Sequence, residues 1–166
     1  VEVRPFSDRV VLPHEETLSK AKDDRFRLMC ATGCNFSSVY SLYRDKEGTV
    51  RDVIRASEAL PILAEFTDGE GVTHTLRKIE DESTVAAVVD AFADKQLFIA
   101  DGHHRYETAL NFKNHLAANG NPNGWQADSM LMTLVDLEDD GLVVLPTHRL
   151  IRDMEVNKDA FLQGAA

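Results

Sequence analysis

The segment with the most specific chemical pattern is LFIADGHHRYETAL, which covers residues 97–110. The apolar run at 97–100 is expected to form a buried strand, and a helix is expected to begin near His103. The N–H groups of a first helical turn lack carbonyl partners within the helix and carry partial positive charge, so they favour an anion. Gly102 has no side chain that would keep a phosphate away from the backbone. This turn therefore predicts a phosphate-binding site.

Basic side chains follow Gly102 directly. Arg105 supplies a planar guanidinium fork that suits phosphate oxygens, and His103 and His104 supply ring nitrogens whose charge depends on pH. A different interpretation is that Asp101 only caps the helix and that the basic residues form a solvated first turn. The concentration of basic residues directly after an apolar strand, in an otherwise acidic chain, favours phosphate binding.

Two further segments, PHEETL and LPTHRLI, carry polar residues of the kind found in binding sites. PHEETL is expected to be a loop, and LPTHRLI follows an apolar run. Loops with such side chains often carry function, although an acidic helix start or a capped sheet edge would use the same residue types. The candidate cleft residues in and near these segments are His14, Glu15, Thr17, Arg25, His148 and Arg149.

A metal centre made by the chain alone is not expected. Cys30 and Cys34 share one helical face at their four-residue spacing, but no third or fourth cysteine accompanies them. Adjacent helical residues such as His103 and His104 point about 100° apart and are poorly placed to hold one ion. A Mg²⁺ ion carried in by a nucleotide, and held through water by Asp101 or Glu15, fits the residues better.

The elements that must position these residues indicate an α+β fold with a mixed or antiparallel sheet and flanking helices. Strands are expected within residues 36–45 and 97–100, and hairpins within 62–80, turning at DGEG, and within 129–151, turning at EDDG. Helices are expected from about residue 20 to Gly33, within 48–60, 81–94 and 105–119, and from about residue 156. We expect residues 1–166 to form a single domain that is a piece of a longer protein.

Composition limits the classes of partner. Apolar residues make up 43% of the 166-residue chain, which is enough for a core, and no apolar run reaches the length of a membrane-spanning helix. The 18 basic and 28 acidic side chains give a net charge of −10, which repels nucleic-acid backbones. We therefore expect a cytoplasmic protein that binds neither nucleic acid nor membrane. The sequence leaves its oligomeric state open.

Three ordered segments, LPHEETL with the following DDR, FIADGHHRYETAL and LPTHRLI, resemble a family of bacterial and archaeal proteins of unknown function whose hallmark is an Ala-Asp-Gly-His-His-Arg box. The box also resembles the Gly-x-His-Arg nucleotide motif of the ParB/sulfiredoxin-like superfamily. That superfamily includes sulfiredoxin, the CTP-binding partition protein ParB, and an ADP-dependent free-serine kinase. The resemblance implies a ParB/sulfiredoxin-like core.

The same resemblance implies roles for individual residues. Gly102, His103, His104 and Arg105 would contact the phosphates of ATP or ADP, and Asp101 would lie beside the transferred group or Mg²⁺. The implied activity is a kinase reaction on a small hydroxylated metabolite such as an amino acid. The resemblance gives Glu15 no role, but we expect Glu15 or Asp101 to act as the catalytic carboxylate that orients the acceptor hydroxyl or Mg²⁺. The alternatives are a nucleotide-sensing module without turnover and a structural domain without a ligand. A carboxylate that the serine kinase uses earlier in its chain has no match here.

Overall fold

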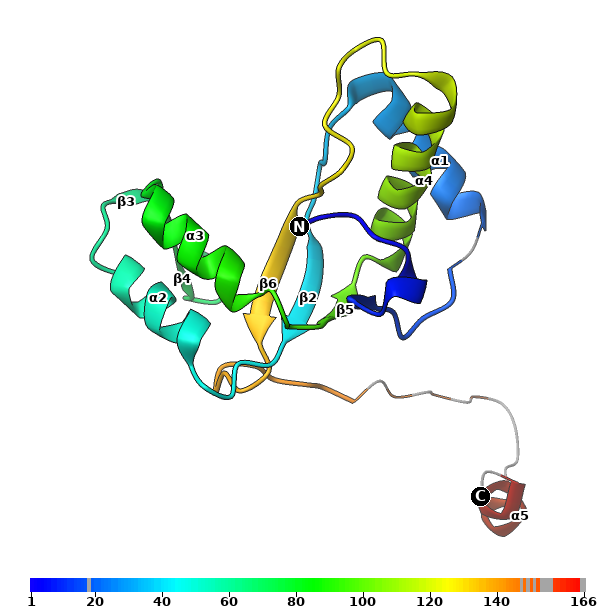
Figure 1. The fold of residues 1–166 in the computed structure, drawn as a ribbon. Coiled ribbons are helices and arrows are strands. Elements are labelled where there is room, and N and C mark those ends of the chain that lie inside the picture. Colours follow the sequence, from blue (N-terminus) through cyan, green and yellow to red (C-terminus); the bar gives the residue numbers. More distant parts are fainter. Residues whose placement is uncertain (18, 147, 149, 151, 153–156, 165–166) are drawn as a thin grey trace.

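The computed structural model describes residues 1–17, 19–146, 148, 150, 152 and 157–164. Its chain is α+β, with a four-stranded mixed sheet, a separate hairpin and helices (Figure 1). The strands are β1 (Val11–Leu12), β2 (Val39–Tyr43), β3 (Ile62–Thr67), β4 (Thr73–Arg77), β5 (Leu97–Asp101) and β6 (Met132–Asp136). The α-helices are α1 (Ser19–Thr32), α2 (Thr49–Ser57), α3 (Glu82–Ala91), α4 (His103–Asn119) and α5 (Lys158–Gly164), and a 3₁₀ turn covers Phe6–Asp8.

The main sheet has the strand order β1-β5-β2-β6. β5 runs parallel to β1 and antiparallel to β2, and β2 runs parallel to β6, so the sheet is mixed as the sequence predicts. The helices α1 and α4 pack against each other on one side of this sheet, and α2 and α3 lie with the β3–β4 hairpin on the other side of the molecule (Figure 1). β5 is a central strand, and the DGHHR turn follows its end.

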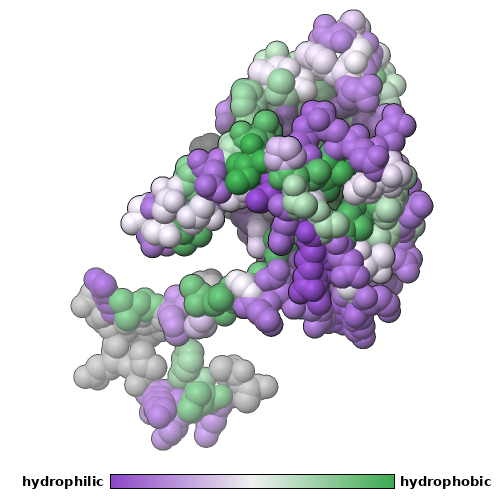
Figure 2. Space-filling view, turned by 90° about the vertical axis from the view of Figure 1, so that its left-hand side faces the viewer, coloured by the Kyte–Doolittle hydropathy of each residue, from purple (hydrophilic) through white to green (hydrophobic). Residues whose placement is uncertain are grey.

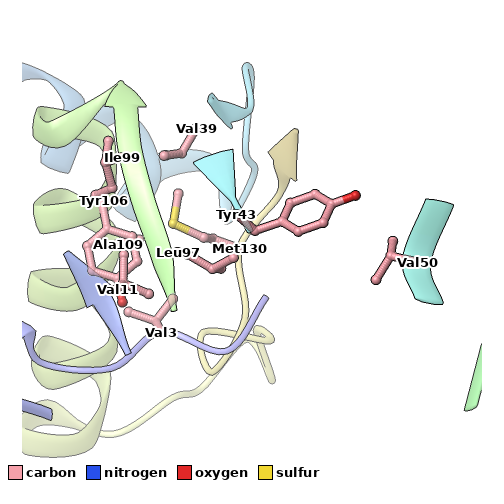
Figure 3. Packing of buried hydrophobic residues seen from close by; sticks show 10 residues of the cluster. All are labelled: Val3, Val11, Val39, Tyr43, Val50, Leu97, Ile99, Tyr106, Ala109 and Met130. Carbon is pink, nitrogen blue, oxygen red and sulfur yellow. The ribbon is translucent and has the colours of Figure 1, made fainter. Parts of the chain in front are cut away.

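The core lies between the sheet and the buried face of α4. Its members include Ile99 from β5 and Tyr106 from α4, which are 1% and 0% exposed. The Tyr106 hydroxyl donates to the Arg4 carbonyl over 2.7 Å and accepts from the Arg4 N–H over 3.0 Å, so its polar end is satisfied. In Figure 3, Tyr43 points away from the other core residues and toward Val50 of α2. Both residues belong to the core cluster, so α2 is joined to the main sheet at this point.

Sequence patterns predict most elements well, miss β1 and predict one hairpin wrongly. The strands β2 and β5, the β3–β4 hairpin and all five α-helices lie where they are expected. The second hairpin, expected within 129–151, is wrong: β6 pairs in parallel with β2, and residues 142–146 form no strand. Val143, Val144 and Leu145 are instead exposed. Alternating apolar residues indicate strand propensity but do not specify the neighbouring strand, and β6 finds its partner in β2.

The β3–β4 hairpin and α3 leave apolar side chains at the surface. Both β3 and β4 are largely exposed, and α3 exposes Val85 and Val89. Figure 2 faces this side of the molecule, and hydrophobic side chains lie there among hydrophilic ones. Of the helices that the structure describes, none combines the length and the apolar character that crossing a membrane requires.

Asp45, which is fully buried between β2 and α2, is the basis of a stability prediction. Its Oδ2 accepts hydrogen bonds from the N–H groups of Val50 (2.9 Å) and Arg51 (3.1 Å), and its Oδ1 lies 3.4 Å from Lys95 Nζ. Asp45→Ala removes the acceptor for two helix N–H groups and leaves Lys95 without this partner. We expect the free energy of unfolding to fall by roughly 1–3 kcal/mol in urea titrations.

The matched control is Asp90→Ala, which removes the same charge from an exposed position of α3. We expect it to change the free energy of unfolding by less than about 0.5 kcal/mol. Equal effects of the two substitutions would show that the buried carboxylate does not hold the start of α2.

Candidate functional site: a polar cleft at the DGHHR turn

The DGHHR turn (residues 101–105) opens into a polar cleft of about 410 Å³. We call it the Gly102 cleft. Its lining residues, which come from the PHEETL loop, α1, the segment before β2, and the DGHHR turn, are Glu15, Arg25, Ser37, Asp101, Gly102, His103, His104 and Arg105. All of these except Ser37 are expected from the sequence. Residues that lie far apart in the chain are thus brought to the end of β5.

The Arg105 side chain folds back over the start of α4. Its Nη1 donates to Ser37 Oγ over 2.8 Å, and its Nη2 forms an ion pair with Asp101. A guanidinium has five N–H groups. Two of them are used in these contacts, and the structure gives the other three no partner among the described residues. Arg105 is therefore fixed in place and keeps three N–H groups that can donate to a ligand.

Gly102 makes this arrangement of Arg105 possible. It lies at φ +98°, in the region that favours glycine, and a Cβ atom there would stand 2.8 Å from Arg105 Nε and Nη2. The space that a side chain would take is therefore occupied by the guanidinium. The group that approaches the bare backbone of Gly102 is thus the Arg105 guanidinium, and not directly a phosphate as the sequence predicts.

The end of β5 is bent by an irregularity in its pairing with β2. Tyr40 pairs with Asp101 and Ser41 pairs with Ile99, so the register shifts by one residue and Ala100 is the extra residue. Such bulges turn a strand and redirect the side chains that follow. Gly102 then acts as the residue before the first turn of α4 and provides no side-chain cap. The interpretation of Asp101 as a helix cap is thus not what the geometry shows: its carboxylate pairs with Arg105.

His103 is 2% exposed and joins the PHEETL loop to the cleft. Its Nε2 accepts the backbone N–H of His14 over 3.2 Å, so in the neutral ring the proton is on Nδ1, which lies 3.5 Å from Glu15 Oε2. Burial, with a smaller effect of nearby His14, lowers the pKa of His103 below its usual value, which keeps the ring neutral. The neutral ring of His103 therefore lies beside the Glu15 carboxylate without carrying a positive charge.

The PHEETL loop is held at two further points. His14 Nδ1 lies 2.8 Å from the Ile99 carbonyl, and Thr17 Oγ1 donates to Glu107 Oε2 over 2.8 Å. Lys22 of α1 also binds Glu107 Oε2, over 2.7 Å. Burial alone would raise the pKa of Glu107, but the hydrogen bonds from Lys22 and Thr17 lower it below its usual value. The carboxylate is thus an anchor for the loop.

Three of the candidate residues that the structure describes, His14, Thr17 and His148, are absent from the lining of the Gly102 cleft. His148 is exposed in the segment after β6. Arg149 lies outside the described residues. In the part of the chain with described side chains, no three His, Cys, Asp or Glu residues are grouped so that they could hold a metal ion.

Sequence analysis missed two residues that shape the site. Ser37 lies just before β2, and the antiparallel pairing of β2 with β5 brings it next to Arg105. Glu107 lies one helical turn after His103 and therefore on the same side of α4. A charged residue on that partly buried face was the signal that could have identified Glu107. Ser37 could be found only from the strand pairing.

A family model for "Protein of unknown function (DUF1015)" matches residues 1–166. The chain belongs to this family. Comparisons with curated proteins and with solved structures found no match. The geometry of the Gly102 cleft is therefore the main source of functional inference for this DUF1015 chain.

Gly102→Ala tests the close contact with Arg105. The new Cβ has to displace the guanidinium, and alanine at this φ is strained, so we expect a loss of about 1–2 kcal/mol in the free energy of unfolding together with weaker binding of anions such as pyrophosphate. Gly48→Ala is the matched control, because Gly48 also precedes a helix at positive φ but has open space around it. The control should lose similar stability and keep anion binding. Equal anion binding by both variants would show that the contact has no role in the site.

The neutral state of buried His103 predicts a pH dependence of stability. Because its pKa is lower in the folded protein than the ordinary 6.5, the unfolded chain binds more protons just below that pH. The contribution of neutral His103 to the free energy of unfolding should thus be complete above about pH 6.5. It should decrease as the pH falls from about 6.5 toward the pKa of the folded protein. NMR titration of the His103 ring should give a pKa below 6.5, whereas a value above 6.5 would contradict the assigned tautomer and environment.

Proposed function

We propose that this chain binds the phosphates of a nucleotide, ATP or ADP, in the Gly102 cleft. The observation that carries the proposal is the position of Arg105, whose guanidinium lies against the Gly102 backbone at the start of α4 with three N–H groups available. Guanidinium groups and helix N-termini both favour phosphate oxygens. The two kinds of donor converge on one polar cleft here.

The charge around the cleft supports the same proposal. The whole chain has a net charge of −10, whereas in this cleft the two cations Arg25 and Arg105 balance the two carboxylates of Glu15 and Asp101. Local cations can attract a small anion even when the rest of the surface repels a long one such as nucleic acid. A small phosphorylated ligand is thus the anion that fits both the local and the overall charge. Nucleic acid and membrane are not proposed as partners.

We further propose that the reaction is phosphoryl transfer to a hydroxyl group of a small metabolite, such as an amino acid. The acceptor oxygen attacks the terminal phosphorus, the bond from phosphorus to the bridging oxygen breaks, and the shortened nucleotide leaves with that oxygen. The hydroxyl proton passes to a carboxylate, for which Glu15 is the candidate because it lines the cleft and is 58% exposed. His103 would position Glu15, and Arg105 would stabilise charge on the phosphates.

The cleft residues suit a Mg²⁺ ion that accompanies the nucleotide. Mg²⁺ is usually held by one or two carboxylates together with phosphate oxygens and water, and Glu15 and Asp101 are the carboxylates that line the cleft. When bound, the ion would neutralise phosphate charge. Asp101 would then exchange its contact with Arg105 for the ion, which would free the guanidinium for the phosphates.

The finer fold assignment also belongs to this proposal. We infer that the mixed sheet and α4 correspond to a ParB/sulfiredoxin-like core, in which a Gly-x-His-Arg turn at a helix start binds nucleotide phosphates. The support is the resemblance of Gly102, His104 and Arg105 to that motif, and the position of the motif at the start of α4. A cytoplasmic location is part of the same proposal.

A nucleotide-sensing role without turnover is the second candidate. The observation that favours it is the ion pair between Asp101 and Arg105, because it engages one of the two carboxylates proposed for catalysis. Prolonged incubation with ATP or ADP, Mg²⁺ and a panel of amino acids distinguishes the two. Consumption of nucleotide supports the transferase, and tight binding without consumption supports the sensor.

Arg105→Ala tests the binding site directly. Because Arg105 pairs with exposed groups, we expect the melting temperature to stay nearly unchanged while calorimetric binding of ATP and ADP is lost. Arg55→Ala is the matched control, since it removes one positive charge from an exposed position of α2 and should bind as wild type does. Wild-type affinity in the Arg105 variant would overturn the assignment of the site.

A further inference from the structure

A second, mostly apolar pocket adjoins the Gly102 cleft. Its volume is about 150 Å³, and Arg25, Ser37 and Arg105 line both this pocket and the cleft. The apolar members of its wall are Leu28, Met29, Phe36 and Met130. We call it the Phe36 pocket. A ligand whose charged end lies against Gly102 therefore has an apolar space beside it, separated from it only by shared side chains.

The dimensions of the Phe36 pocket limit the apolar group that it can take. A cavity of about 150 Å³ lined by apolar side chains can hold one benzene ring. The Phe36 pocket has the same volume and is partly open to solvent, so a planar ring system can enter it and extend outward. Two methionines, Met29 and Met130, add polarizable sulfur atoms that make favourable contacts with aromatic rings.

Phe36 is positioned by a loop that is fixed at both ends. At one end Gly33, at φ +64°, packs against Trp125, whose ring atoms would lie 2.8 Å from a Cβ on Gly33. At the other end Ser37 accepts its hydrogen bond from Arg105. Phe36, between these points, is 68% exposed at the pocket. An aromatic face held at the edge of a ring-sized pocket suits stacking on a planar ligand.

The polar groups of the pocket also suit a heterocycle. Cys34, Asn35 and Thr108 are part of its wall, and pockets that bind small molecules combine apolar walls with a few such groups. The guanidinium of Arg105 can stack on an aromatic ring as well as bind phosphate. Nucleobases combine a flat apolar face with polar edges, whereas an aliphatic group offers nothing to the polar wall.

We infer that the Phe36 pocket is the base subsite of the same ligand, so that one nucleotide spans both spaces, with its base on Phe36 and its phosphates at Gly102. This inference rests on the proposed nucleotide binding in the Gly102 cleft. It adds the requirement that the ligand carry an aromatic base, which phosphate binding alone does not demand. It also assigns Phe36 and Met29 to recognition.

The test compares ADP with pyrophosphate by titration calorimetry at equal Mg²⁺ concentration, on the whole chain. Both probes carry a diphosphate, but only ADP carries a base. We expect ADP to bind wild type at least about 10-fold more tightly than pyrophosphate, and Phe36→Ala to remove most of that difference while leaving pyrophosphate affinity unchanged, as the usual size of base stacking predicts. Phe66→Ala, which removes a 62% exposed phenylalanine from β3, is the matched control and should bind both probes as wild type does.

The outcomes separate this inference from the proposed function. If wild type binds both probes equally, or if Phe36→Ala leaves ADP affinity unchanged, the base subsite is overturned while phosphate binding stands. If wild type binds neither probe, the proposed function itself fails, and the base subsite fails with it. The urea midpoint of Phe36→Ala should match wild type, because an exposed ring contributes little to folding.

Discussion

The structure of the site depends on one contact, the approach of the Arg105 guanidinium to the backbone of Gly102. The contact needs a residue without a side chain at positive φ, a bulge that bends the end of β5, and Ser37 on the other side to accept a hydrogen bond. Ser37 is available because β2 pairs with β5. The pairing of β2 with β5 therefore helps to set the position of the charged group at the end of β5, because it brings Ser37 next to Arg105 although the two lie 68 residues apart.

The second constraint is the neutral, buried ring of His103, which links the first turn of α4 to the PHEETL loop. Its backbone belongs to the turn that we propose to bind phosphate, while its ring accepts the backbone N–H of His14 and faces Glu15. The two adjacent histidines thus have different roles. His103 is buried and contacts the PHEETL loop, and His104 lines the cleft. Because Glu107 holds the same loop from one turn further along α4, a single helix positions both the basic and the acidic side of the cleft.

The sequence predicts local elements better than the contacts between them. The strand and helix around Gly102, the DGEG hairpin and the stop at Gly33 all follow from patterns within a few residues, and they are confirmed. The hairpin at EDDG was wrong because the partner of β6 is β2, roughly ninety residues earlier in the chain. For the same reason Ser37 and the pocket beside Phe36 could not be predicted, since both depend on which strands are neighbours. The role of Gly102 was predicted only in part, because its spacing to Arg105 does not reveal that the guanidinium folds back.

The most direct test of the account observes the backbone N–H groups at the start of α4 while a diphosphate is added. In a ¹H–¹⁵N correlation spectrum of the labelled chain, pyrophosphate should shift the amide signals of Gly102, His103 and Arg105 saturably, together with the Nε–H signal of Arg105. Signals from α2 and the β3–β4 hairpin should stay in place. Unchanged signals at the DGHHR turn, or equal shifts spread over the whole chain, would contradict the claim that this turn binds phosphate.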